Sequence, residues 1–334
     1  MKIIIPLAGI GSRLKPHTNT VPKPLMEVAG IPIVEYVILE SIKLNPSEII
    51  FVVGYKKKSI KDYVSKFHPK LNCSYVEQTK RDGDGSAVRL ALEKIKKEED
   101  IFIIYGADTL IDFDIRKGIK NNKDADALIF TKKVDNPSNY GVVDIDSTRE
   151  IYEVEEKPII PKSNLAIIGA YYFKSLLHVK KQLNSFYEKG ITEKGEYRTV
   201  QVINSYIKTK DKSIKSVCVE EWFDCGRPEV LLNANRYFLK KKSSNKQIIR
   251  GTSLILPPSY IAKSAKIENC IIGPYASIGS EVVIKNSIVK DSVVSYQSEI
   301  KNTILKESLI GKQVLIEGKK SKLNLGEKSH FAIL

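Results

Sequence analysis

The stretch GIGSRLKPHTNTVPKPL, residues 9–25, comes directly after the apolar run Ile3-Ile4-Ile5-Pro6-Leu7-Ala8. The run predicts a buried strand, and the two glycines that follow predict a loop whose backbone can approach nucleotide phosphates. A dinucleotide-binding loop needs a third glycine where Leu14 stands, and a Walker A loop needs a closing Gly-Lys-Ser/Thr that is missing. Arg13 and Lys23 instead suit a loop that stabilises a departing pyrophosphate. The alternative is a turn-rich loop with surface cations.

Up to about residue 240 the chain alternates short apolar runs with amphipathic stretches. The apolar runs predict strands at Lys2–Pro6, Glu48–Gly54, Asp100–Gly106 and Asp126–Lys132. The amphipathic stretches predict helices at Ile33–Leu44, Ser59–Phe67 and Ser86–Lys97. This alternation predicts an α/β fold with a mainly parallel sheet covered by helices. Ligands of such sheets bind beyond the carboxyl ends of the strands, so we expect residues 9–13 and the segment after Tyr105 at that edge.

Beyond residue 259 aliphatic residues recur every five or six positions. They are Ile261, Ile267, Ile272, Ile278, Ile284, Val289, Val294, Ile300, Leu305, Ile310 and Ile316. Taken in threes they define turns of 16 or 17 residues with three short sides, a pattern typical of a parallel β-helix. Chance spacing in a β-rich domain is the alternative. The predicted organisation is a first domain at residues 1–240, a linker at 241–259, a β-helix at 260–320 and a tail at 321–334.

Composition narrows the classes of protein that fit this chain. A net charge of +15 over 334 residues favours anionic partners, either a nucleic acid or a polyphosphate. The lysines are spread along the chain, which favours an ordinary solvated surface and no nucleic acid. No apolar run reaches the ~18 residues of a membrane helix and no secretory signal precedes the first strand, so we expect a cytoplasmic protein without a membrane partner. Four cysteines and four histidines lie scattered without zinc or disulfide spacing.

The segment LAGIGSRLKPHTNTVPKPL resembles the signature of the sugar-1-phosphate nucleotidylyltransferases, in which G-x-G-[ST]-R-L is followed by P-K-P. Further motifs follow in the same order: EQTKRDGDGSA, YGAD, YGVVDID, EEKP, GAYYF and WFDCGRPE. The resemblance covers nearly all of residues 1–240. It implies a Rossmann-like nucleotidyltransferase (GT-A-like) architecture. Many members also carry a left-handed parallel β-helix of the hexapeptide-repeat type, which matches the β-helix predicted at residues 260–320.

The resemblance implies a role for each residue that matches a motif. It assigns nucleotide binding to Leu7, Ala8, Gly9, Gly11, Ser12, Arg13, Gln78 and Gly83, with Gln78 reading a pyrimidine base. It assigns catalysis to Arg13, Lys23, Asp108 and Asp224, the last two as ligands of Mg²⁺. It assigns the sugar phosphate to Gly141, Glu156, Lys157 and Gly169, with Glu156 on hydroxyls and Lys157 on phosphate.

These roles agree with the chemistry of the residues, and each has an alternative. Two carboxylates with phosphate oxygens are the usual surroundings of Mg²⁺, and lysine is a point-charge ligand of phosphate. Asp224 also suits a turn or helix cap, because Cys225-Gly226 predicts a turn before a helix. Glu156-Lys157 also suits a surface ion pair, and Gln78 an exposed loop amide.

Two positions depart from the family pattern. The usual glycine–threonine–alanine of the base loop is Gly83-Asp84-Gly85 here, so this loop does not by itself determine the choice of base. Ala107 separates the usual glycine–aspartate pair, so Asp112 and Asp114 compete with Asp108 as metal ligands.

The expected reaction is attack of a sugar 1-phosphate on the α-phosphorus of dTTP or UTP, with release of pyrophosphate. Glucose 1-phosphate is the first choice of sugar, and a mannose-1-phosphate guanylyltransferase is the alternative. A catalytically silent regulatory homologue would lack the arginine, lysine or aspartates, and all are present. A second, acyl-transferring activity usually needs a histidine on the β-helix, and the tail offers only His330. We expect the β-helix to support a homo-oligomer.

Overall fold

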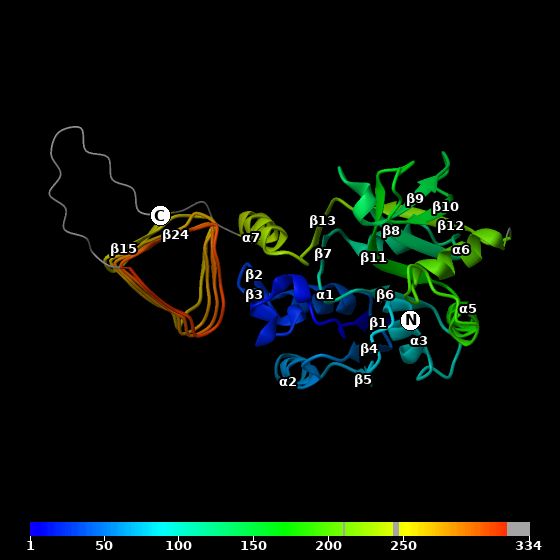
Figure 1. The fold of residues 1–334 in the computed structure, drawn as a ribbon, viewed down its shortest axis with the longest axis horizontal. Coiled ribbons are helices and arrows are strands. Elements are labelled where there is room, and N and C mark those ends of the chain that lie inside the picture. Colours follow the sequence, from blue (N-terminus) through cyan, green and yellow to red (C-terminus); the bar gives the residue numbers. More distant parts are fainter. Residues whose placement is uncertain (210, 243–246, 319–334) are drawn as a thin grey trace. The chain divides into compact units, whose positions relative to one another are not determined.

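The computed structural model describes residues 1–209, 211–242 and 247–318 and divides into two compact units (Figure 1). One unit comprises Met1–Glu27 and Ile31–Ala234, and the other comprises Val28–Gly30 and the chain from Asn235 onwards. Helix α7 (Pro228–Lys242) runs from the first into the second, so the boundary falls inside a helix. The division at residue 240 followed by a linker is corrected accordingly. The predicted tail at 321–334 lies outside the described residues.

A nine-stranded sheet forms the centre of the first unit, in the order β10-β9-β11-β6-β1-β4-β5, with β8 joining β11 to β12. Its strands are β1 (Lys2–Pro6), β4 (Glu48–Val53), β5 (Cys73–Glu77), β6 (Ile101–Ile104), β8 (Ala127–Lys133), β9 (Gly141–Ile145), β10 (Ile151–Glu156), β11 (Leu165–Phe173) and β12 (Ile214–Cys218). The strands β6, β1, β4 and β5 are all parallel, which confirms the predicted parallel centre. Strand β11 runs antiparallel to β6, β8 and β9 and extends the sheet.

Helices cover both faces of this sheet. Ile3 and Ile5 of β1 pack in one buried cluster with helices α1 (Ile33–Ile42), α2 (Lys57–Phe67) and α4 (Ile115–Lys120). Ile4 packs in the opposite cluster with α3 (Asp84–Leu92), α5 (Leu176–Glu188) and α6 (Val200–Lys208). A strand buried on both faces needs apolar residues at successive positions, which explains the unbroken isoleucine run. The three helices predicted from sequence are present, with shifted ends.

The carboxyl ends of the parallel strands lead into the segments that carry the motifs. After β1 the chain passes through the 3₁₀ turns η1 (Ser12–Leu14), η2 (His17–Asn19) and η3 (Lys23–Leu25). Beyond β6, a small antiparallel sheet pairs β7 (Thr109–Asp112) with β13 (Glu221–Asp224). This pairing brings the YGAD and WFDCG motifs together although more than 100 residues separate them.

The second unit contains a parallel β-helix whose coils stack as triangles, and it fits the left-handed type expected (Figure 1). Its strands are β15 (Ser253–Ile255), β16 (Tyr260–Ile261), β17 (Lys266–Glu268), β18 (Ile271–Ile272), β19 (Ser277–Ile278), β20 (Val283–Lys285), β21 (Ile288–Lys290), β22 (Val293–Val294), β23 (Glu299–Lys301), β24 (Ile304–Lys306), β25 (Leu309–Ile310) and β26 (Leu315–Glu317). Three sheets, one for each side, run through the stacked coils. The predicted aliphatic positions pair with one another in register, as in Ile261–Ile278–Val294–Ile310.

The β-helix begins earlier than predicted. Strand β15 pairs in parallel with β18, and Ile255 lies opposite Ile272, so Ile255 extends the inward ladder into the segment assigned to a linker. The short strand β14 (Ile248–Arg250) pairs with β15 from the other side. Pro257-Pro258 interrupts the aliphatic pattern just after Ile255, which explains why the sequence analysis started the ladder at Ile261. Among the described residues no helix is both long enough and apolar enough to span a membrane.

Candidate functional site

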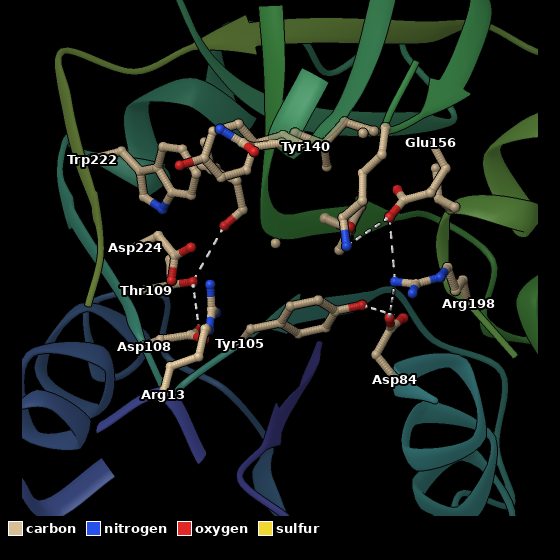
Figure 2. A pocket seen from close by; sticks show the side chains of 18 residues that line it. Arg13, Asp84, Tyr105, Asp108, Thr109, Tyr140, Glu156, Arg198, Trp222 and Asp224 are labelled. Carbon is tan, nitrogen blue, oxygen red and sulfur yellow. Dashed lines mark hydrogen bonds and ion pairs between the residues drawn. The ribbon is translucent and has the colours of Figure 1, made fainter. Parts of the chain in front are cut away.

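A cavity of about 220 Å³ in the first unit brings together the motifs at the carboxyl edge of the sheet (Figure 2). The predicted site residues that line it are Arg13, Asp108, Gly141, Glu156, Lys157, Gly169 and Asp224. Leu7, Ala8, Gly9, Gly11, Ser12, Lys23, Gln78 and Gly83 are not among its lining residues. The cavity therefore joins the predicted metal and sugar residues, while most of the predicted nucleotide-binding residues lie outside its lining.

Lys23 is buried and forms an ion pair with Asp108, with 2.6 Å between Nζ and Oδ2. Its place follows from the glycine loop, because Gly11 has a φ of 72° and a Cβ there would lie 2.9 Å from the Cβ of Lys23. Thr18 fastens the same loop by donating its hydroxyl to the carbonyl of Gly11 at 3.0 Å. Gly11 thus allows close packing against Lys23. Lys23 itself does not line the cavity but forms its ion pair with Asp108, which does.

Asp224 is both a turn residue and a cavity residue. Its Oδ1 accepts the backbone N–H of Gly226 at 3.1 Å, as the turn interpretation expects, while its carboxyl group lines the cavity. The backbone N–H of Cys225 donates to the carbonyl of Asp108 at 2.9 Å, which fixes the two aspartates side by side. Burial and the neighbouring Asp108 carboxylate both raise the pKa of Asp224. Two carboxylates held this close to each other attract a cation.

These two carboxylates are the candidate ligands of a Mg²⁺ ion. Asp114 does not line the cavity; it caps α4 by accepting the N–H of Lys117 at 3.0 Å, and Asp112 is not among the lining residues either. No group of three or more His, Cys, Asp or Glu side chains suited to a metal occurs in the described part of the chain. The pair still fits Mg²⁺, which commonly binds one or two carboxylates and completes its shell with water and substrate phosphates.

A recess of about 270 Å³ adjoins the cavity and shares Arg13, Tyr140, Lys157 and Asp224 with it. Arg227 also lines this recess and was not singled out from the sequence. Gly226 leaves room for the arginine, because a Cβ there would lie 2.6 Å from Nη2 of Arg13. Within residues 1–209, 211–242 and 247–318 no acidic group forms an ion pair with Arg13 or Arg227. Three cations around one recess suit a phosphate-bearing ligand.

Gln78 lies at the end of β5 and is buried, so the alternative of an exposed amide is wrong. Its Nε2 donates to the carbonyl of Gly83 at 2.9 Å, which fixes the amide against the loop before α3. Gly83 has a φ of 124°, and a Cβ there would lie 2.1 Å from the carbonyl oxygen of Tyr197. Only glycine fits this position. Leu7 and Ala8 follow β1 in the chain and are buried, whereas Gly9 is exposed with open space around it.

The predicted sugar residues meet on strands β9, β10 and β11. Gly141 lies opposite Glu156 in the β9–β10 pair, and a Cβ on it would lie 2.8 Å from Oε2 of Glu156. Lys157 Nζ lies 3.8 Å from Oε1 of Glu156. The ion pair expected as an alternative is therefore present, but Glu156 is mostly buried and lines the cavity. Gly169 has a φ of 74°, and a Cβ there would collide with the ring of Tyr105.

Several lining residues were not predicted from the sequence. They are Asp84, Tyr105, Thr109, Asn139, Tyr140, Ile167, Ile168, Tyr171, Arg198, Val200 and Trp222. Asp84 could have been found, because it stands at one of the two places where the sequence departs from the family pattern. Arg198 gave no such signal, since it lies in a segment without a motif. Trp222 Nε1 is a buried donor that has no hydrogen-bond partner within the described part of the chain.

Known proteins resemble this chain both in sequence and in fold. The bifunctional protein GlmU of Methanocaldococcus jannaschii is 32% identical, over 88% of this chain and 77% of that protein. The glucose-1-phosphate thymidylyltransferase of Streptomyces antibioticus is 27% identical, over 90% and 88%. The chain spans only 55–60% of the length of the matching Methanococcus GlmU proteins. A UDP-glucose pyrophosphorylase solved with UDP-glucose shares the fold, with a TM-score of 0.62, 23% identity and coverage of 72% of this chain and 99% of the other.

The nucleotidyl transferase family model matches residues 2–241, which include the glycine loop, both aspartates and the residues of the cavity. This match covers more than half of the chain and agrees with the parallel sheet and with the fold shared with the solved pyrophosphorylase. The motifs that resembled the family therefore lie within the residues that the family model matches. The chain belongs to the nucleotidyl transferase family and is an enzyme of that family.

Proposed function

We propose that the chain joins a sugar 1-phosphate, with glucose 1-phosphate as the first candidate, to UTP or dTTP and releases pyrophosphate. The observation that carries this proposal is the single cavity that brings the cations and paired aspartates near the glycine loop together with the carboxylate of Glu156. The named relatives in the comparisons include a glucose-1-phosphate thymidylyltransferase and a UDP-glucose pyrophosphorylase, which supports the same reaction class.

In this reaction a phosphate oxygen of the sugar 1-phosphate attacks the α-phosphorus of the triphosphate in line. A new P–O bond forms, the bond from the α-phosphorus to the bridging oxygen breaks, and pyrophosphate leaves with the electron pair. The nucleophile is already an anion, so no general base is needed. The protein has to hold two polyanions together against their repulsion, and positioning with charge neutralisation provides most of the catalysis.

Arg13, Lys157 and Arg227 provide positive charge around the recess, and no ion pair among the described residues occupies Arg13 or Arg227. We assign Arg13 to the leaving pyrophosphate and Lys157 to the phosphate of the sugar. Lys23 balances the charge of Asp108 from the buried side. The exposed Gly9 and the backbone N–H groups after it are left for the triphosphate. Each cation then neutralises charge that the reactants bring into the site.

Asp108 and Asp224 would hold Mg²⁺, which supplies charge neutralisation on the triphosphate when it is bound. The role of the chain is to keep the two carboxylates adjacent. The β7–β13 pairing does this through the backbone, and Lys23 compensates part of the negative charge.

The choice of a pyrimidine triphosphate is supported by Gln78. Its amide nitrogen is engaged by the carbonyl of Gly83, so its carbonyl oxygen remains as an acceptor. An acceptor in that position suits the N3–H donor of uracil or thymine. The alternative mannose-1-phosphate guanylyltransferase would need a different base contact, and it is tested in the same assay.

The test is a panel of the five common nucleoside triphosphates against several sugar 1-phosphates with Mg²⁺, measured by pyrophosphate release. We expect turnover with UTP or dTTP and glucose 1-phosphate. Turnover with GTP and mannose 1-phosphate alone would shift the assignment to the alternative. No turnover in any combination would reject the enzyme proposed here and would favour the regulatory homologue.

A second, acyl-transferring activity is not proposed, although the GlmU relatives are named bifunctional. The described β-helix, residues 247–318, contains no histidine that could act as a base. Incubating the chain with an acyl-coenzyme A and an amino sugar phosphate, and measuring free thiol, tests this directly.

A further inference from the structure

Asp84 and Arg198 form an ion-paired chain with Glu156 along one wall of the cavity (Figure 2). Nη1 of Arg198 lies 3.3 Å from Oε1 of Glu156 and 3.9 Å from Oδ2 of Asp84. Asp84 stands where the family has threonine in its base loop, and Arg198 belongs to the segment that precedes α6. The two side chains therefore connect the loop at residues 83–85, called the nucleotide loop below, with the carboxylate of Glu156.

The hydrogen bonds of Arg198 leave it little freedom to bind a ligand itself. Its Nη2 pairs with Glu196 at 2.9 Å, and its Nε donates to the carbonyl of Glu193 at 3.4 Å. The planar guanidinium holds its partners in a fixed arrangement, so a group fastened on several sides acts as a clamp. It forms an ion pair with one residue predicted to bind the sugar, Glu156, whose side chain is 9% exposed.

Asp84 is held as firmly as Arg198. Its Oδ1 accepts the hydroxyl of Tyr105 at 2.6 Å and the backbone N–H of Thr199 at 2.7 Å. Burial and the Asp84 carboxylate raise the pKa of Tyr105 well above its usual value, so the phenol stays protonated and remains a donor. The backbone on either side is also locked, because Gly85 N–H donates to the carbonyl of Tyr197 at 2.8 Å. Hydrogen bonds therefore join the loop at residues 83–85 to the segment at residues 197–199.

We propose that Arg198 is a positioning residue that fixes the carboxylate of Glu156 for the sugar hydroxyls, and that Asp84 holds Arg198 in place from the nucleotide loop. This inference rests on the proposed function and adds the residues that link sugar binding to the base loop. Without Arg198, Oε1 of Glu156 loses the shorter of its two ion pairs and, within the described part of the chain, keeps the 3.8 Å pair with the half-exposed Lys157. The sugar hydroxyls would then meet a carboxylate that is no longer held in one position, and binding of the sugar phosphate would weaken.

The test is steady-state kinetics of Arg198→Met and Arg198→Lys with the sugar phosphate and the triphosphate that the wild type accepts. We expect Arg198→Met to raise the KM of the sugar phosphate by about tenfold and to leave the KM of the triphosphate within about twofold. Arg198→Lys keeps the charge and should recover part of that loss. Asp84→Asn keeps the acceptor for Tyr105 and loses the charge toward Arg198, so it should raise the KM of the sugar phosphate by less than Arg198→Met does. In the double variant Asp84→Asn should add nothing to the effect of Arg198→Met.

Arg236→Met is the matched control, because it removes an arginine that pairs with Asp291 through both Nε and Nη2 in the second unit. It should leave both KM values unchanged. A lowered melting temperature with unchanged KM values for Arg198→Met would mean a merely structural role and would overturn the inference. Additive effects of Asp84→Asn and Arg198→Met would overturn the link to the nucleotide loop. An inactive wild type would instead reject the proposed function, on which this inference depends.

Discussion

The two ends of the cavity differ in how far their charges are already paired. At the end near the glycine loop, Arg13 and the Arg227 of the adjoining recess form no ion pair among the described residues, and Asp224 lies against Asp108, which is paired with the buried Lys23. At the other end Asp84, Arg198, Glu156 and Lys157 form a chain of ion pairs within the protein. Unpaired charges are left for ligands that bring their own charge, whereas a paired network preorganises the acceptors for a neutral sugar ring. We therefore expect substitutions at the first end to affect turnover and those at the second to affect KM.

The largest effect is expected from Asp224→Asn at the end near the glycine loop. The amide keeps the acceptor for Gly226 and loses the negative charge that would hold a cation, so turnover should fall by about 1,000-fold with little change of fold. Pyrophosphate release at saturating Mg²⁺ and both substrates measures this. Asp114→Asn, which weakens only a helix cap, is the control. Wild-type turnover in Asp224→Asn would exclude this carboxylate from catalysis.

Arg13→Met should lower turnover by about 100-fold, because it removes one charge from the leaving pyrophosphate. The KM of the sugar phosphate should change little, since Arg13 lies among the cations near the glycine loop. Arg149→Met, at a positive-φ turn outside the lining of the cavity, provides the comparison. A rise in the KM of the sugar phosphate without loss of turnover would remove the distinction between the two ends.

Gly141→Ala probes the paired end. The added methyl group would lie 2.8 Å from Oε2 of Glu156, so the carboxylate has to move. We expect the KM of the sugar phosphate to rise by about tenfold with turnover nearly unchanged. Gly190→Ala is the matched control, because no atom lies within 4 Å of a Cβ at that position and Gly190 is not among the residues that line the cavity. Equal effects of the two substitutions on this KM would show that the held carboxylate is unimportant.

The smallest effect concerns stability and pH. Because the pKa of Asp224 is raised in the folded protein, the ionised carboxylate costs stability at neutral pH. That cost arises as the pH increases from the unfolded pKa through the folded pKa, and it is absent below both. Asp224→Asn should therefore raise the melting temperature at pH 8 by a few degrees, with the difference disappearing toward pH 3. Melting curves without divalent cations test this, and a lower melting temperature at pH 8 would contradict the assigned cause.

The parts of the fold that follow from sequence are those with a strict local pattern. The unbroken run at β1 reflects burial on two faces, and the β-helix ladder reflects inward positions that stack in register. The metal candidates and the sugar residues follow from family motifs. The expected homo-oligomer stays a prediction.

The wall that contains Asp84, Tyr105 and Arg198 could not be predicted in this way. Its members come from three segments that approach one another only after the sheet has formed, and no spacing along the chain records that approach. The same reason hides the burial of Gln78, which depends on the loop that ends at Gly83. The choice between Asp108 and Asp114 as metal ligand also depended on the structure, because Asp114 caps helix α4.

The in-register ladders of the β-helix make its length modular. Ile278 lies directly opposite Val294 in the next coil, so the segment from Ile278 to Val293 is one complete turn. A deletion of this segment would let Val294 take the place of Ile278 beneath Ile261 and would keep every side in step. The β-helix can therefore gain or lose whole coils while the remaining coils stay in register, whereas the insertion or deletion of a single residue would shift all three ladders at once.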